Sequence, residues 1–165
     1  MDRAYDFLDL SDLHARGAGL NSTTAARPTS TTWSPARVYL VASGVFLVFA
    51  AAIGFSVNSA FPATPGEVRS AGSGHIFGIF ETNGWHNATS LISGAIALGF
   101  AVKPGWARTG AFVKGFMYVG VTVSIAIWGP ETFKIASNAA DQVVHGLLGV
   151  TGLAAALATP RVHKR

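Results

Sequence analysis

Long apolar segments alternate with short polar ones along most of this chain. The clearest apolar segment covers residues 38–57, "VYLVASGVFLVFAAAIGFSV", and carries no charge. Three further apolar segments follow at about residues 85–102, 111–128 and 139–157. A helix of about 20 apolar residues crosses the hydrocarbon core of a bilayer. The pattern therefore predicts an all-α fold, an integral membrane four-helix bundle made of two tandem helical hairpins.

The polar segments divide the chain into a leader, a helical domain and a tail. Residues 1–35 are rich in Asp, Ser, Thr and Pro, which favours a flexible leader. Residues 36–160 contain the four predicted helices, and residues 161–165, "RVHKR", form a basic tail. The stretch "HIFGIF" at residues 75–80 is expected to form a short turn of helix at the membrane interface.

Composition supports the membrane interpretation. Half of the residues are hydrophobic (50%) and only 12% are charged, whereas a soluble domain carries about 25%. The chain has no Cys, which excludes disulfides and cysteine-based metal sites. The formal charge is +4, but the basic residues flank apolar segments. This placement is typical of a membrane surface, so we expect the lipid bilayer as a partner and no nucleic acid.

The distribution of Lys and Arg predicts the orientation in the membrane. Most of them fall on one side of the four predicted helices: Arg37, Lys103, Arg108, Lys114, Arg161, Lys164 and Arg165. Arg69 and Lys134 fall on the other side. The positive-inside rule makes the first side cytoplasmic, so both termini of this multi-pass inner (plasma) membrane protein are expected in the cytoplasm. Lys114 is expected one turn inside its helix, where its ammonium reaches the headgroups.

The beginnings of the second and fourth apolar segments share one template. The second reads "HNATSLISG" and the fourth reads "DQVVHGLLG". The matched pairs are His86 with Asp141, Asn87 with Gln142, Ser90 with His145, and Gly94 with Gly149. A weaker similarity relates Gly44 and Gly54 to Gly120 and Gly129. The chain therefore reads as an internal repeat of two helical hairpins related by an axis near the membrane normal.

Helical spacing places these residues on common faces. Positions i, i+4 and i+8 share a face, so polar and small residues stack along the second and fourth helices. Gly94, Gly149 and Gly152 are candidate helix-packing positions. We expect the second and fourth helices to meet at the centre of the bundle. The candidate polar cluster then lies at the extracytoplasmic end and consists of His86, Asn87, Ser90, Asp141, Gln142 and His145.

The same residues resemble a known family. Their pattern is similar to the four-helix actinobacterial membrane family catalogued as domain of unknown function 4383. Members read "GxFxxNxxHNxxH" into the second helix and "NxxDNxxH" into the fourth. The matching residues here are Gly78, Phe80, Asn83, His86, Asn87, Asn138, Asp141 and His145. Ser90 and Gln142 depart from a usual His and Asn. The resemblance implies the fold and leaves the function open.

Several functions remain open at this stage. We expect an uncharacterised, non-enzymatic scaffold or accessory subunit without a cofactor, paired with a membrane protein or with a second copy of itself. A divalent metal site is an alternative, with ligands from His75, Glu81, His86, Asp141 and His145. Haem b held between His86 and His145 is another, as part of a redox protein. A small-solute or proton pathway through the cluster is the last.

Overall fold

The computed structural model describes residues 33–70 and 74–161 of the chain. Residues 1–32 of the predicted leader and residues 162–165 of the predicted tail lie outside the described residues. The long helices are α2 (Pro35–Val57), α4 (Gly84–Val102), α5 (Pro104–Trp128) and α6 (Ala139–Ala158). Within this part of the chain, α2, α5 and α6 are long and apolar enough to cross a membrane.

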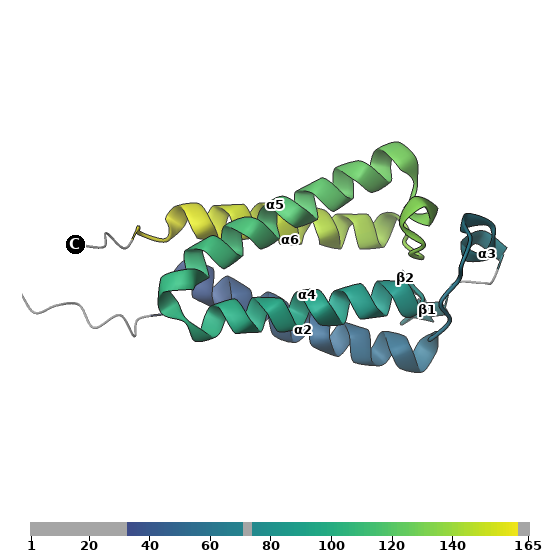
Figure 1. Ribbon diagram of the computed structural model, residues 1–165, viewed down its shortest axis with the longest axis horizontal. Coiled ribbons are helices and arrows are strands. Elements are labelled where there is room, and N and C mark those ends of the chain that lie inside the picture. Colours follow the sequence, from purple (N-terminus) through teal and green to yellow (C-terminus); the bar gives the residue numbers. More distant parts are fainter. Residues whose placement is uncertain (1–32, 71–73, 162–165) are drawn as a thin grey trace, which may run out of the picture. The chain divides into compact units, whose positions relative to one another are not determined.

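Four short elements connect the long helices at one end. Helix α3 (Pro65–Ser70) and the strands β1 (Gly74–Ile76) and β2 (Phe80–Thr82) lie between α2 and α4. The 3-10 helix η1 (Pro130–Phe133) lies between α5 and α6. We call this the β-hairpin end (Figure 1). At the opposite end, α4 turns directly into α5, and α2 begins close to where α6 finishes (Figure 1).

The stretch "HIFGIF" forms strands, so the expectation of a helical turn is wrong. β1 and β2 pair antiparallel, with His75 opposite Glu81 and Ile76 opposite Phe80. The turn uses two residues with positive φ, Phe77 at 54° and Gly78 at 73°. A glycine at such a position avoids the steric cost of a side chain, and this favours a reversal over a continued helix.

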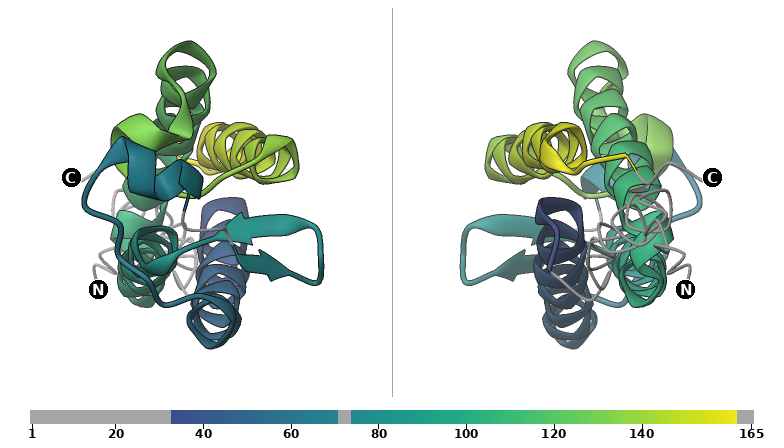
Figure 2. Two further views of the ribbon diagram at one scale, coloured as in Figure 1. Left: turned by 90° about the vertical axis from the view of Figure 1, so that its right-hand side faces the viewer. Right: turned by 90° about the vertical axis from the view of Figure 1, so that its left-hand side faces the viewer.

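The long helices pack as two pairs, α2 with α4 and α5 with α6, seen end-on in Figure 2. Within each pair, the two helices approach each other closely at glycines. A Cβ added at Gly94 would lie 2.9 Å from the Gly44 carbonyl oxygen of α2. A Cβ added at Gly149 would lie 2.8 Å from the Val119 backbone nitrogen of α5. The small faces therefore join helices within each pair.

The expectation that the second and fourth helices meet closely at the centre is wrong. The two pairs contact each other mainly through α4 with α5 and through α2 with both α5 and α6. Gly94 of α4 and Gly149 of α6 already contact α2 and α5 inside their own pairs, so they are not available to bring the α4 and α6 backbones together. Helices α4 and α6 approach each other through side chains at the β-hairpin end.

The buried core between the two pairs consists mostly of small side chains. Its members are Ala36, Leu40, Ala97, Ala101, Ala107, Ala111 and Ala156, each at most 4% exposed. They gather toward the end opposite the β-hairpin, where Ala36 N donates to Thr159 Oγ1 at 2.9 Å. Two arginines close the same end. Arg37 Nε donates to the Ala101 carbonyl at 3.0 Å, and Arg108 Nε donates to the Ala156 carbonyl at 3.1 Å.

Candidate functional site

The β-hairpin end holds the candidate polar cluster, and asparagines begin both of its helices. Asn83 is the N-cap of α4, with its Oδ1 accepting from His86 N at 2.9 Å. Asn138 is the N-cap of α6 and accepts from Asp141 N at 3.2 Å. Such caps satisfy backbone donors that a helix start leaves unpaired. They also explain why His86 and Asp141 occupy the third position of their helices.

Asn87 joins three segments around the beginning of α4. Its side chain is 2% exposed. Its Nδ2 donates to the Asn58 carbonyl at 2.9 Å, and its Oδ1 accepts from the Thr82 hydroxyl. Gly54 of α2 faces this amide directly, and a Cβ there would collide with Asn87 Oδ1. The buried amide therefore ties the end of α2 and strand β2 to α4.

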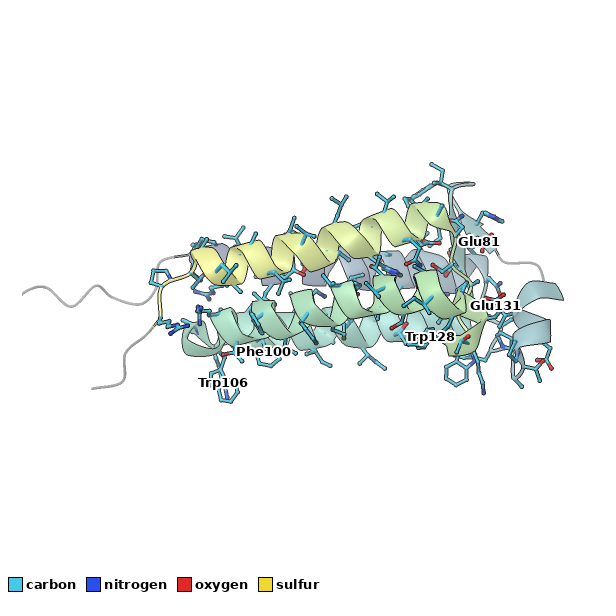
Figure 3. The ribbon with its side chains drawn as sticks, turned by 90° about the horizontal axis from the view of Figure 1, so that it is seen from above. Glu81, Phe100, Trp106, Trp128 and Glu131 are labelled. Atoms are coloured by element: carbon cyan, nitrogen blue, oxygen red, sulfur yellow. The ribbon has the colours of Figure 1, made fainter. Side chains whose placement is uncertain are left out.

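Asp141 does the same for α6. Its Oδ2 accepts from Asn138 N at 2.9 Å, which completes a capping box, and from Glu81 N at 3.1 Å. The second bond reaches across to β2, so the β-hairpin is fixed to both helix pairs. Glu81 lies at the end of the bundle where α6 begins (Figure 3).

His86 has a defined tautomer in its neutral form. Its Nδ1 lies 3.0 Å from the Glu81 carbonyl oxygen and 2.7 Å from the Ala136 carbonyl oxygen. Both partners only accept hydrogen bonds, so Nδ1 carries the proton. Its Nε2 then presents a lone pair toward the interior of the cluster. His86 thus holds β2 and the segment before α6 together while one ring nitrogen stays available.

His145 and Ser90 differ from their neighbours because no hydrogen bond engages their side chains within the described residues. His145 is 8% exposed and Ser90 is 9% exposed. The buried Nδ1 of His145 has no partner there. The His145 ring lies edge-on to His86, with centroids 5.7 Å apart, and 5.6 Å from the Tyr118 ring. These two polar side chains are therefore buried without a hydrogen bond to the described residues.

Two cavities meet at His86, Ser90 and His145. The first, of about 220 Å³, extends between α2, the β-hairpin and α6, and both Glu81 and Asp141 line it. The second, of about 440 Å³, extends between α4, α5 and η1, and Ser93 and Tyr118 line it. The cluster therefore forms a partition between an acidic cavity and one lined by hydroxyl groups.

Lys114 lies deeper in its helix than expected and contacts Ser93 from outside the lining of the second cavity, so the expected position one turn inside its helix is wrong. Helix α5 begins at Pro104, which places Lys114 almost three turns inside, about 15 Å along the axis. Its side chain is 6% exposed. Its Nζ donates to Ser93 Oγ at 3.1 Å and lies 4.9 Å from the centroid of the Tyr118 ring.

The residues considered as metal ligands are divided between different roles. His75 Nε2 lies 3.7 Å from Glu81 Oε1 on the surface of the β-hairpin, away from His145. Across residues 33–70 and 74–161, no group of three His, Asp or Glu side chains gathers closely enough to hold a metal ion. Gln142 Nε2 donates to Ser137 Oγ at 2.7 Å instead of pointing at His145. The metal and haem alternatives remain predictions.

Sequence reasoning missed several residues that build this end. Asn83 and Asn138 are helix caps, which the spacing "NxxH" and "NxxD" could have indicated. Ser93 is three residues after Ser90 and shares its face of α4. Tyr118 is one turn after Lys114 and shares its face of α5. No sequence signal connects the lysine and the tyrosine to Ser93, because that contact depends on tertiary packing.

Comparison with protein families decides the classification. Residues 37–158 match the family described as Domain of unknown function (DUF4383). The chain belongs to this family. The match confirms the resemblance and contains all six residues of the candidate cluster, from His86 to His145. No curated protein and no solved structure matches this DUF4383 chain significantly.

Proposed function

We propose that this chain is a multi-pass plasma membrane protein with four spanning helices and both termini in the cytoplasm. In this proposal it is a non-catalytic scaffold or accessory subunit. The polar cluster would organise its extracytoplasmic end, where other membrane proteins or a second copy could contact it.

The distribution of side-chain size supports a bilayer around the helices. Large apolar residues point outward, for example Phe49 at 66% exposed, Phe116 at 68% and Leu157 at 72%. The core instead consists largely of Ala and Gly. Small residues inside and large apolar residues outside are expected where lipid replaces water and close backbone contact stabilises the fold.

Helix α4 fits the same environment despite its polar beginning. It has 19 residues and packs along α2. Asn87 and Ser90 are buried, whereas Ile92 and Ile96 on its outer face are 59% and 54% exposed. Its polar side chains therefore face protein and its apolar ones face outward, as a fourth spanning helix requires.

The observation that carries the scaffold role is that the hydrogen bonds of the cluster go mainly to backbone atoms. Asn87, Asp141 and His86 bond mainly to backbone atoms of the β-hairpin and of the loops before α4 and α6. Groups held in this way fix the positions of the segments that they bond. A stable, defined surface at the β-hairpin end follows from them.

Equivalent arginine and glycine contacts in the two helix pairs support the internal repeat. Arg37 caps the end of α4, and Arg108 caps the end of α6. Gly44 and Gly115 each follow their arginine by seven residues and each contact the partner helix of their own pair. Gly115 therefore corresponds to Gly44 better than Gly120 does, since nothing lies within 4 Å of a Cβ at Gly120.

Cysteine labelling tests the orientation, because the chain has no native Cys. Thr132→Cys in η1 and Gly105→Cys at the start of α5 are both exposed positions. A membrane-impermeant maleimide should label Thr132→Cys in spheroplasts of a bacterial host and Gly105→Cys only in inverted vesicles. The reverse pattern, or protein released without detergent, would contradict the proposal.

A redox or metal-binding role for His86 and His145 is the second candidate. It is favoured by the ring nitrogens that no described residue engages. Absorbance spectra and metal analysis of the purified protein separate the two candidates. A Soret band or stoichiometric metal that disappears in His145→Leu would establish the second and reject the scaffold role.

A further inference from the structure

Ser93, Tyr118 and His145 line the second cavity between α4, α5 and η1, and Lys114 lies directly behind Ser93. Lys114 Nζ has three N–H groups, and its one hydrogen bond within the described residues goes to Ser93 Oγ. Tyr118 Oη also donates to Ser93 Oγ, at 3.2 Å. Ser93 therefore accepts twice, and its own hydroxyl hydrogen is left without an acceptor among the described residues. The buried Nδ1 of His145, which also lines this cavity, has no hydrogen-bond partner among the described residues.

The charge at this site is not neutralised by the described part of the chain. No carboxylate there pairs with Lys114, whose polar contacts are a serine hydroxyl and an aromatic ring. The two acids nearest the cluster, Glu81 and Asp141, line the other cavity. An ionisable side chain at this depth is costly in a membrane unless it serves a partner or a ligand.

The rest of the cavity lining is apolar, and the cavity opens onto the outer surface of the helices. Besides the hydroxyl and imidazole groups, the lining consists of Ile92, Ile96, Met117, Val121, Phe133 and Ile135. Ile92, Ile96 and Met117 are 59%, 54% and 43% exposed, so the cavity reaches the outer surface along the seam between α4 and α5. In a bilayer that seam faces lipid tails.

We propose that this cavity binds a long-chain carboxylic acid that enters sideways from the bilayer. The carboxylate accepts hydrogen bonds from Ser93 and His145, Lys114 supplies the opposite charge from behind Ser93, and the hydrocarbon chain lies between α4 and α5. Ser93 is nine residues into α4, about 14 Å along its axis. A phospholipid phosphate stays at the membrane surface, so a single-chain acid fits this depth better. The inference rests on the membrane placement in the proposed function.

Binding of tritiated palmitate to the purified full-length protein in detergent tests this proposal. We expect saturable binding to the natural protein, with hexadecanol competing at least about tenfold more weakly because it lacks the charge. Lys114→Met should weaken palmitate binding about tenfold or more. Lys103→Met removes an exposed lysine by the same substitution and should leave binding unchanged.

Ser93→Ala and His145→Leu make the same comparison without removing the lysine, and each should weaken palmitate binding while the protein stays monodisperse. The proposal is overturned if palmitate does not saturate, if hexadecanol competes equally well, or if these variants and Lys114→Met all bind as the natural protein does. Cysteine labelling on the same protein keeps the two proposals apart. Correct orientation without palmitate binding rejects only the ligand, whereas an inverted or soluble protein rejects the membrane placement.

Discussion

At the residue scale, chemically similar side chains in the cluster have different roles. Asn87 and Asp141 are buried and fully committed to neighbouring segments. His145 is about as buried, and its Nδ1 has no hydrogen-bond partner in the described part of the chain. Burying a polar group without a hydrogen bond costs free energy, so the two kinds of residue should respond differently to substitution.

Asn87→Leu should lower the free energy of unfolding by about 2 kcal/mol or more, because the Asn58 carbonyl and the Thr82 hydroxyl would lose their partner. Unfolding by sodium dodecyl sulfate, followed by far-ultraviolet circular dichroism, measures this change. Thr89→Val is a matched control on α4, since its hydroxyl bonds back to its own helix. The linking role of Asn87 is refuted if both variants unfold alike.

His145→Leu should change the free energy of unfolding by less than about 1.5 kcal/mol, because it leaves no described group without a partner and nearly conserves volume. The same unfolding experiment applies, with Asn87→Leu as the reference for a destabilised protein. A loss as large as that of Asn87→Leu would show that His145 stabilises the cluster through its ring contacts with His86 and Tyr118.

At the scale of elements, the small residues decide which helices pair. Gly115 faces the backbone of α6, where an added Cβ would lie 2.6 Å from Leu153 N and 2.9 Å from the Gly149 carbonyl oxygen. Gly44 faces the α4 backbone in the same manner, 3.1 Å from the Gly94 carbonyl oxygen. Each pair is therefore held together at a distance that only glycine permits.

Gly115→Ala should destabilise the pair of α5 and α6 by about 1–3 kcal/mol, since the backbones must separate to admit the methyl group. Gly120→Ala on the same helix is the control, because nothing lies within 4 Å of its added Cβ. Its effect should stay within about 0.5 kcal/mol. Equal losses in detergent unfolding experiments would contradict the packing role of Gly115, because alanine favours a helix over glycine and helix propensity alone predicts no loss.

The sequence predicted the long helices better than their neighbours. Hydrophobic periods placed α2, α4 and α6 within a few residues, whereas α5 begins at Pro104 instead of near residue 111. Residues 103–110 were interpreted as a polar turn, although proline is favoured in the first turn of a helix and Pro104 begins α5. The small residues predicted that helices pack closely, but the sequence of one helix face does not identify the helix that packs against it. That choice depends on the loops, including the β-hairpin.

At the scale of the described molecule, its two ends differ in packing and polarity. The β-hairpin end contains two cavities and the buried polar cluster. The opposite end is filled by alanines at most 4% exposed, and Arg37 and Arg108 cap its helices. Lys114 lies between these regions. The polar interior therefore resembles a chamber with one closed end, which suits binding better than passage through the membrane.

Proteoliposomes test this closed end against the alternative of a proton pathway. With a pH-sensitive dye inside, vesicles containing the protein should collapse an imposed pH gradient no faster than empty ones, because the core of that end consists of buried Ala and Leu side chains, which cannot carry a proton. Gramicidin added to the same vesicles supplies the positive control. A faster collapse that Lys114→Met abolishes would show that protons pass the alanine layer, and the chamber would then be one half of a pathway.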